Sequence, residues 1–129
     1  MIRPADYGIK FYSDCIFARN DFIEKNPDIV QRFVSASLKG WEYALANKDS
    51  AVTSVLKYAP QLDRESQAYM LSAAEPLILS ENSSMLGLID SQSVLSMVKI
   101  LQEQKLLPQN FDVSKSFSNK FVLKYYGKK

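Results

Sequence analysis

Polar aromatic residues and carboxylates are concentrated in one short stretch near the N-terminus, Asp6-Tyr-Gly-Ile-Lys-Phe-Tyr-Ser-Asp14. A tyrosine ring offers a flat face for stacking and a hydroxyl for hydrogen bonding, and a carboxylate accepts hydrogen bonds or balances a cationic ring. A segment of this composition can line a pocket for a small heteroaromatic or cationic ligand. The candidate ligand-binding residues are Tyr7, Phe11, Tyr12 and Asp14. The alternative, which composition alone favours, is an edge strand whose tyrosines pack on the first helix.

The sequence has no histidine and one cysteine, Cys15, and these counts exclude much of catalytic chemistry. Ser-His-Asp and Cys-His nucleophile pairs and histidine-containing zinc sites all need an imidazole. One thiol forms neither an internal disulfide nor a metal cluster, and its apolar neighbours predict that Cys15 is buried and inert. The four glycines lie far apart, so there is no glycine-rich phosphate loop. We therefore expect no enzyme, no metal site and no cofactor.

The carboxylates are spread along the chain in positions that have structural explanations. Aspartates of the kind that begin helices are Asp28, Asp49, Asp63 and Asp90. Glutamates beside lysines or arginines, as in surface pairs, are Glu24, Glu42, Glu65 and Glu103. Neither group predicts a catalytic acid or base.

Length and charge predict one ordinary domain. A chain of 129 residues can bury roughly two thirds of its unfolded surface. A net charge of +2 is too small to predict a nucleic-acid partner. No run approaches the roughly 20 apolar residues that span a bilayer. The start of the chain lacks the apolar region of a signal peptide, which predicts a cytoplasmic protein if the chain is complete.

The periodicity of the sequence changes after residue 19. Ile9, Phe11, Ile16 and Phe17 favour short extended segments at about 7–12 and 14–18. Helical spacing follows, and it predicts a turn at 20–24 and helices at 27–47, 49–58, 64–75, from 90 or 91 to before Pro108, and from 114 onward. The fold class predicted is mainly α with a short N-terminal β segment.

The long helix at 27–47 has one apolar stripe. It contains Val30, Phe33, Val34, Leu38, Trp41 and Leu45 at steps of three and four residues. Trp41 on this stripe is predicted to be a core residue. Gly40 lies inside the helix, where glycine costs about 1 kcal/mol relative to alanine, so it is expected to mark the close approach of another backbone.

The order of these segments resembles the NMT1/THI5-like substrate-binding proteins. The most specific pieces are the helix start Asn26-Pro-Asp28, the run Lys39-Gly-Trp-Glu-Tyr-Ala44, and the terminal pattern Asp112-Val-Ser-Lys followed by Phe117-Ser-Asn-Lys-Phe121. The runs Asp6–Tyr12, Gly87–Asp90 and Lys105–Pro108 also match the family, so the resemblance covers nearly the whole chain.

The resemblance implies a solute receptor of an ABC importer for a thiamine-pyrimidine precursor or a similar small nitrogenous compound. It implies a fragment of a type II periplasmic-binding-protein α/β fold, in which residues 1–129 form a single partial domain. Residues 1–19 would then cross the hinge in extended form, and residues 20–129 would be the helical C-terminal part of the receptor lobe. The family's first lobe has no counterpart here, so the isolated chain is expected to bind ligand weakly or not at all.

Partners and location follow from the same resemblance. Full-length relatives deliver ligand to an ABC permease and are periplasmic or extracytoplasmic. The alternative function is a helical interaction or sensory domain derived from this fold, which self-associates through apolar faces left uncovered.

Overall fold

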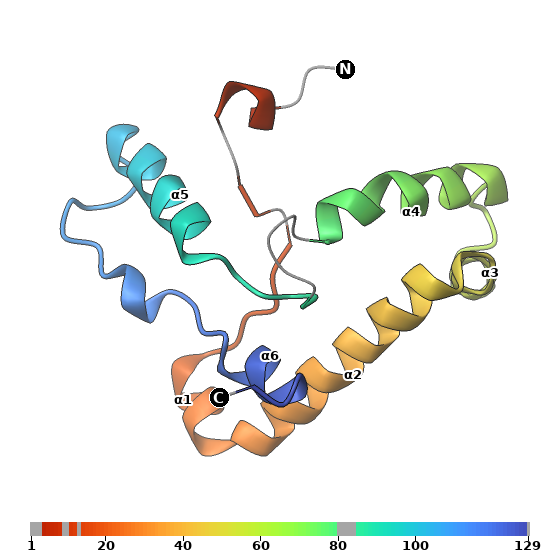
Figure 1. Ribbon diagram of the computed structural model, residues 1–129, viewed down its shortest axis with the longest axis horizontal. Helices are drawn as coiled ribbons and strands as arrows, with labels where there is room; N and C mark the ends of the chain where they lie inside the picture. The colour runs from red at the N-terminus through yellow and green to blue at the C-terminus, as the bar shows by residue number, and fades with distance from the viewer. Residues whose placement is uncertain (1–3, 9–10, 13, 80–84, 129) are drawn as a thin grey trace.

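The computed structural model describes residues 4–8, 11–12, 14–79 and 85–128. The α-helices are α1 (Asn20–Lys25), α2 (Pro27–Ala46), α3 (Lys48–Tyr58), α4 (Arg64–Ile78), α5 (Ser91–Glu103) and α6 (Lys120–Tyr125). Two 3₁₀ helices, η1 (Pro4–Tyr7) and η2 (Val113–Lys115), complete the regular structure (Figure 1).

The predicted β segment is wrong for the residues that the structure describes, which contain no strand. Residues 4–7 form the 3₁₀ helix η1, and residues 11–12 and 14–19 are irregular chain (Figure 1). Ile9 and part of both predicted segments lie outside the described residues. A strand needs a neighbour to accept and donate its backbone hydrogen bonds, and β-propensity supplies none. Phe17, 91% exposed, also lacks the packed face that stabilises a β-former.

Two of the predicted helix caps are confirmed. The carboxylate of Asp63 accepts a hydrogen bond of 2.7 Å from the backbone N–H of Ser66, and that of Asp90 accepts one of 2.8 Å from Ser93. Asn26 precedes Pro27 as predicted but makes no side-chain cap, because its amide donates instead to the carbonyl of Phe22. Two helices differ in extent from the prediction. α4 continues through Pro76 to Ile78, and the expected helix from residue 114 is divided into η2 and α6.

α2 is the element around which the others are placed. Its 20 residues make a rod of about 30 Å, and α1, α3 and α6 contact it. α3 leads into α4, which packs against it, while α5 contacts η2 on the other side of the molecule (Figure 1). None of the described helices is both long enough and apolar enough to cross a membrane.

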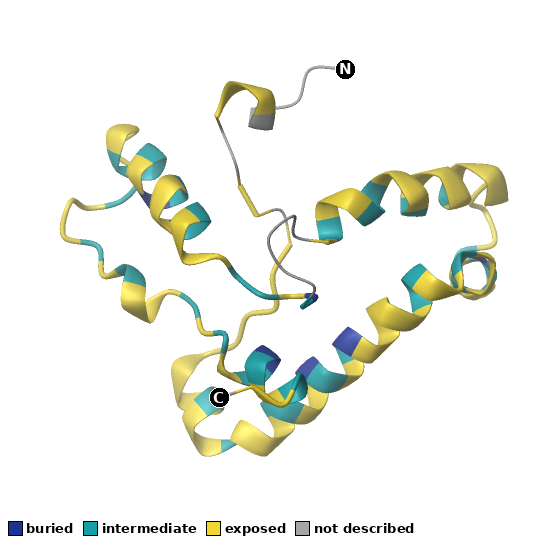
Figure 2. Ribbon diagram, in the orientation of Figure 1, coloured by how far each residue is buried: buried dark blue, intermediate teal, exposed yellow. Residues whose placement is uncertain are grey.

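The core lies where α2, α6 and the segment at residues 85–90 meet. Its buried members are Val34 and Leu38 of α2, Leu86, and Val122 of α6. Figure 2 shows these buried positions on the sides of α2 and α6 that face each other, with intermediate and exposed residues along the rest of α2. This small cluster fixes the 85–90 segment against the long helix.

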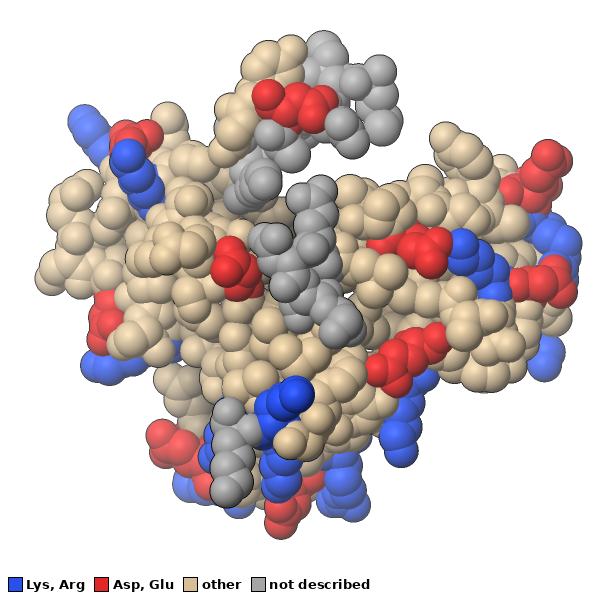
Figure 3. Space-filling model, viewed as in Figure 1, with Lys and Arg blue, Asp and Glu red and all other residues tan. Residues whose placement is uncertain are grey.

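Part of the surface that a domain of this size would bury remains open. The chain has 10,258 Å² of accessible surface, whereas a folded monomer of 14.6 kDa has about 6,900 Å². It therefore buries about half of its unfolded surface rather than the two thirds expected from its length. Much of the face in Figure 3 is covered by uncharged residues, and charges of both signs lie mostly around its edge.

Three further predictions about packing are wrong because each expected a covering element that the described residues do not supply. Trp41 is 47% exposed rather than in the core, and Cys15 is exposed rather than buried. A Cβ placed on Gly40 would have no atom within 4 Å, so no backbone approaches this glycine. Each prediction assumed a neighbouring element that would cover an apolar position, and such an element is missing from the described part of the chain.

Candidate functional site

The four predicted ligand-binding residues lie on the N-terminal segment and are accessible. Tyr7 ends η1 and is 71% exposed, while Phe11 and Tyr12 are 46% and 41% exposed. Asp14 is also exposed. Among the described residues, none of the three aromatic rings stacks on another ring. The structure therefore leaves these side chains available to solvent without gathering them into a formed pocket.

Tyr12 is tied to a distant part of the chain. The backbone N–H of Asp90 donates a hydrogen bond of 2.8 Å to the Tyr12 hydroxyl oxygen. Asp90 is also the N-cap of α5, and its carboxylate accepts from both the backbone N–H and the hydroxyl of Ser93. The backbone hydrogen bond from Ser93, followed by its hydroxyl bond, lowers the pKa of Asp90, which therefore carries a negative charge at neutral pH. The result is a phenol placed at a charged helix start.

The 85–90 segment that receives Tyr12 is held by side chains from the C-terminal region. Asn119 makes two bonds to Ile89, accepting from its N–H at 2.9 Å and donating to its carbonyl at 2.7 Å. The N–H of Leu86 donates to the Tyr126 hydroxyl at 3.0 Å. These bonds satisfy backbone groups that have no helix or sheet partner. They give the segment a defined shape at the point where Tyr12 meets it.

Gly87 brings the same segment close to α2. Its φ of +78° lies in the region that favours glycine, and a Cβ at this position would stand 2.9 Å from Leu38 Cδ2. Glycine is therefore required here both by the backbone conformation and by the space available.

A carboxylate and two phenols join α2 to α6. Glu42 accepts hydrogen bonds from the hydroxyls of Tyr125 at 2.6 Å and Tyr126 at 2.9 Å, and the two rings meet edge to face at 79°. The hydrogen bond to Glu42 is the largest factor that raises the pKa of Tyr125 to about 12. Burial, followed by the bond to Glu42, raises the pKa of Tyr126. Both phenols keep their protons at neutral pH, so the cluster joins the helices and is unsuited to acid–base catalysis.

The sequence did not predict these positioning residues. Glu42 was interpreted as one member of a surface charge pair, and its actual partners lie more than 80 residues later in the chain. Asn119 lies within the Phe117–Phe121 pattern, which could have marked it as a residue with a specific contact. Sequence spacing carries no signal for the bond between Tyr12 and Asp90.

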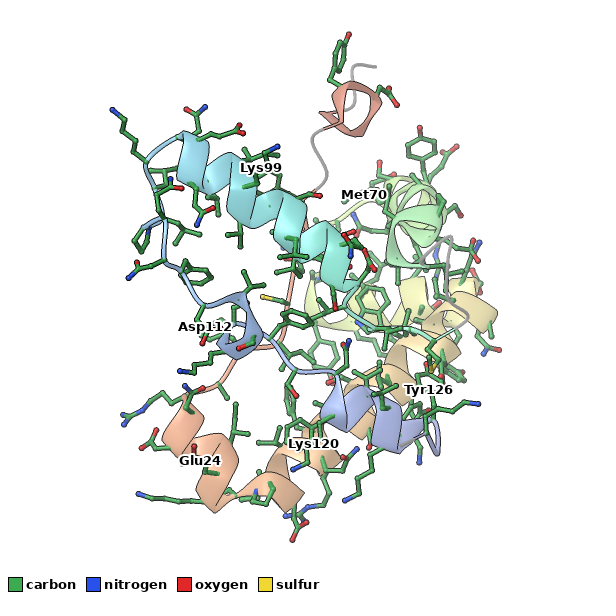
Figure 4. The ribbon with its side chains drawn as sticks, turned by 60° about the vertical axis from the view of Figure 1, so that its left-hand side comes forward. Glu24, Met70, Lys99, Asp112, Lys120 and Tyr126 are labelled. Atoms are coloured by element: carbon green, nitrogen blue, oxygen red, sulfur yellow. The ribbon has the colours of Figure 1, made fainter. Side chains whose placement is uncertain are left out.

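An open hollow lies elsewhere on the surface. It is an open depression on the first turns of α4, lined by Asp63, Glu65, Ser66, Tyr69 and Met70. Figure 4 shows Met70 on α4 well away from Tyr126, which follows α6. The described residues also contain no cluster of three cysteine or carboxylate side chains that could hold a metal ion.

Comparison with known proteins finds a family match over the N-terminal part of the chain. The NMT1/THI5-like family model matches residues 1–51, which include the N-terminal aromatic segment and all of α2. The riboflavin-binding protein RibY of Chloroflexus aurantiacus is 32% identical over 105 residues, covering 78% of this chain and 30% of the relative. The chain is similar to the NMT1/THI5-like family over its first 51 residues.

A second relative matches a shorter part of this chain. A formylaminopyrimidine-binding protein of Halalkalibacterium halodurans is 32% identical over 55 residues, 42% of this chain and 17% of the relative. Both relatives are named as binding proteins rather than as enzymes. The matched chain spans less than a third of either relative, and no solved structure matches it significantly.

Proposed function

We propose that this chain is the C-terminal part of a non-catalytic solute receptor of an ABC importer. Its ligand class is a small nitrogenous heteroaromatic compound, such as a thiamine-pyrimidine precursor. The observation that carries the proposal is the pair of relatives, because riboflavin and a formylaminopyrimidine both present a flat, nitrogen-containing ring. In this proposal the receptor acts outside the cytoplasm and delivers its ligand to a membrane permease.

The N-terminal aromatic segment has the chemistry to recognise such a ring. Phe11 and Tyr12 offer partly exposed faces for stacking, and Tyr7 offers a third. The carboxylate of Asp14 would accept a hydrogen bond from a ring N–H or amino group. Because the Tyr12 oxygen accepts from Asp90, its own hydroxyl proton is directed elsewhere and would donate to a ligand acceptor.

The size of the chain sets the expected affinity. Small-molecule sites enclose most of the ligand surface, and in this proposal the four residues supply only one side of the site. In this proposal residues 1–19 border the ligand and residues 20–129 hold them in place, while other parts of the receptor supply the opposite wall. The chain alone should therefore bind in the millimolar range, about −4 kcal/mol.

Saturation-transfer NMR of the chain tests this with riboflavin, an aminopyrimidine and, as a non-aromatic comparison, glucose. We expect transfer to both heteroaromatic rings, a reduction in the Phe11→Ala variant, and no change in Tyr58→Ala. Tyr58 is a suitable control because it is 92% exposed and lies on α3. Equal transfer to glucose, or no transfer to either ring, would contradict the proposal.

A further inference from the structure

The outer face of α2 is a continuous apolar surface that the described chain does not cover. Ile29 and Phe33 are 45% and 59% exposed, and Ala36 and Gly40 are exposed beyond them. With Ser37 and Ala44, which are partly buried, these residues recur at helical steps and share one face. We call this face the outer stripe of α2. It lies beside the buried face formed by Val34 and Leu38.

The side chains of the outer stripe are bulky at one end of α2 and small at the other. Ile29 and Phe33 lie in its N-terminal half, while Gly40 and Ala44 lie in its C-terminal half. Glycine in a helix interior lowers helix stability relative to alanine, and nothing lies within 4 Å of the missing Gly40 side chain. The chain's own packing therefore gives no reason for a glycine at this position.

The chain as a whole has more open surface than a stable interface needs. The chain exposes about 3,300 Å² more than a folded monomer of its mass. A standard protein interface buries about 800 Å² on each partner. The outer stripe runs along a helix of about 30 Å, which is long enough to form the centre of such an interface.

We propose that the outer stripe of α2 binds a second copy of this chain, with the two α2 helices antiparallel. A two-fold axis between Ala36 and Ser37 places Phe33 of one copy over Gly40 of the other. The same axis places Ile29 over Ala44, so a bulky side chain meets a small one at each contact. Two-fold symmetry makes every contact occur twice.

Sedimentation equilibrium of the chain from 5 to 500 μM tests the interface. We expect a monomer–dimer equilibrium that Phe33→Glu shifts toward monomer by at least tenfold in dissociation constant. Tyr58→Glu, an equally drastic change on α3, should leave the constant within twofold. Circular dichroism of both variants verifies that α2 stays folded. A monomer throughout the range, or equal effects of the two variants, would overturn the proposal and leave the stripe to another polypeptide.

Cross-linking tests the register separately from stability. In a Cys15→Ser background, Ser37→Cys should give a disulfide-linked dimer under mild oxidation, because the position lies next to the proposed axis. Thr53→Cys on α3 should stay monomeric. The Gly40→Leu variant should weaken dimerisation at least tenfold while α2 keeps its helix content. Equal cross-linking from both cysteines, or unchanged dimerisation of Gly40→Leu, would contradict the antiparallel arrangement.

Discussion

The backbone N–H of Asp90 donates a 2.8 Å hydrogen bond to the hydroxyl oxygen of Tyr12, a residue 78 positions earlier in the chain. This bond links a proposed ligand-binding residue to the N-cap of α5. It orients the phenol and leaves the hydroxyl proton of Tyr12 for another acceptor. The N-terminal segment, which has no strand partner among the described residues, is thereby attached to the helical part.

Replacing Tyr12 with phenylalanine removes the acceptor and keeps the ring. We expect Tyr12→Phe to lower the free energy of unfolding by about 1 kcal/mol, because the Asp90 N–H loses its partner. Urea unfolding measures this, with Tyr58→Phe as the control for loss of an exposed phenol oxygen. Equal stability of the two variants would show that the bond contributes nothing to the fold.

Adding a methyl group at Gly87 should disturb the contact with α2. Gly87→Ala combines a positive φ with a Cβ 2.9 Å from Leu38, and we expect a loss of about 1–3 kcal/mol. Gly127→Ala is the matched control, because its φ is also positive at 66° but its Cβ would meet nothing within 4 Å. Thermal unfolding of both variants separates backbone strain from the clash. A Gly127→Ala loss as large as that of Gly87→Ala would argue against the clash.

Removing the charge of Glu42 should lower the pKa of Tyr125 toward its usual value. The Glu42 hydrogen bond raises the pKa of Tyr125 to about 12 from a usual value of 10.0, so Glu42→Gln should lower it. Absorbance titration at alkaline pH measures the change, and subtraction of the Tyr125→Phe titration assigns it. An unchanged midpoint for Tyr125 in Glu42→Gln would refute the assigned cause.

The same cluster predicts how stability depends on alkaline pH. The pKa of Tyr125 is higher in the folded chain than in the unfolded chain, so its contribution is complete below pH 10 and is lost as the pH rises toward 12. Denaturant unfolding between pH 9 and 12 should show a steeper fall for the native chain than for Tyr125→Phe.

The start of α5 predicts the opposite dependence in acid. Hydrogen bonds from Ser93 lower the pKa of Asp90 below its usual 3.8, so this contribution is complete above that pH. It is lost as the pH falls through the lowered pKa of the folded chain. Asp90→Ala should reduce stability at pH 7 and should flatten the acid limb of the profile between pH 5 and 2. Gln92→Ala, in the same first turn, should leave that limb unchanged.

Local chemistry predicted the helices well. The caps at Asp63 and Asp90 and the Asn26-Pro27 start are short-range signals, and α2, α3 and α4 begin within a residue or two of their predicted starts. The β segment failed because pairing depends on a neighbour that propensity cannot supply. The division between η2 and α6 was also missed, since Asn119 uses its side chain on the distant Ile89 rather than on a local helix turn.

Burial was harder to predict than secondary structure. The apolar stripe of α2 placed Val34 and Leu38 correctly in the core, but it also included Phe33 and Trp41, which are exposed. Periodicity identifies an apolar face without saying what covers it. The candidate site was also predicted only in part. Residue type was enough to select Tyr12, but its hydrogen bond with Asp90 is visible only in the folded structure.

The most direct test of the proposed receptor role is ligand binding in a complete receptor. The 105-residue segment of the flavin-binding relative that matches this chain can be replaced by the chain itself. We predict saturable binding of riboflavin or an aminopyrimidine by calorimetry, with at least tenfold weaker binding when the segment carries Phe11→Ala. A chimera that is folded by circular dichroism and thermal unfolding, yet binds neither compound, would contradict the account.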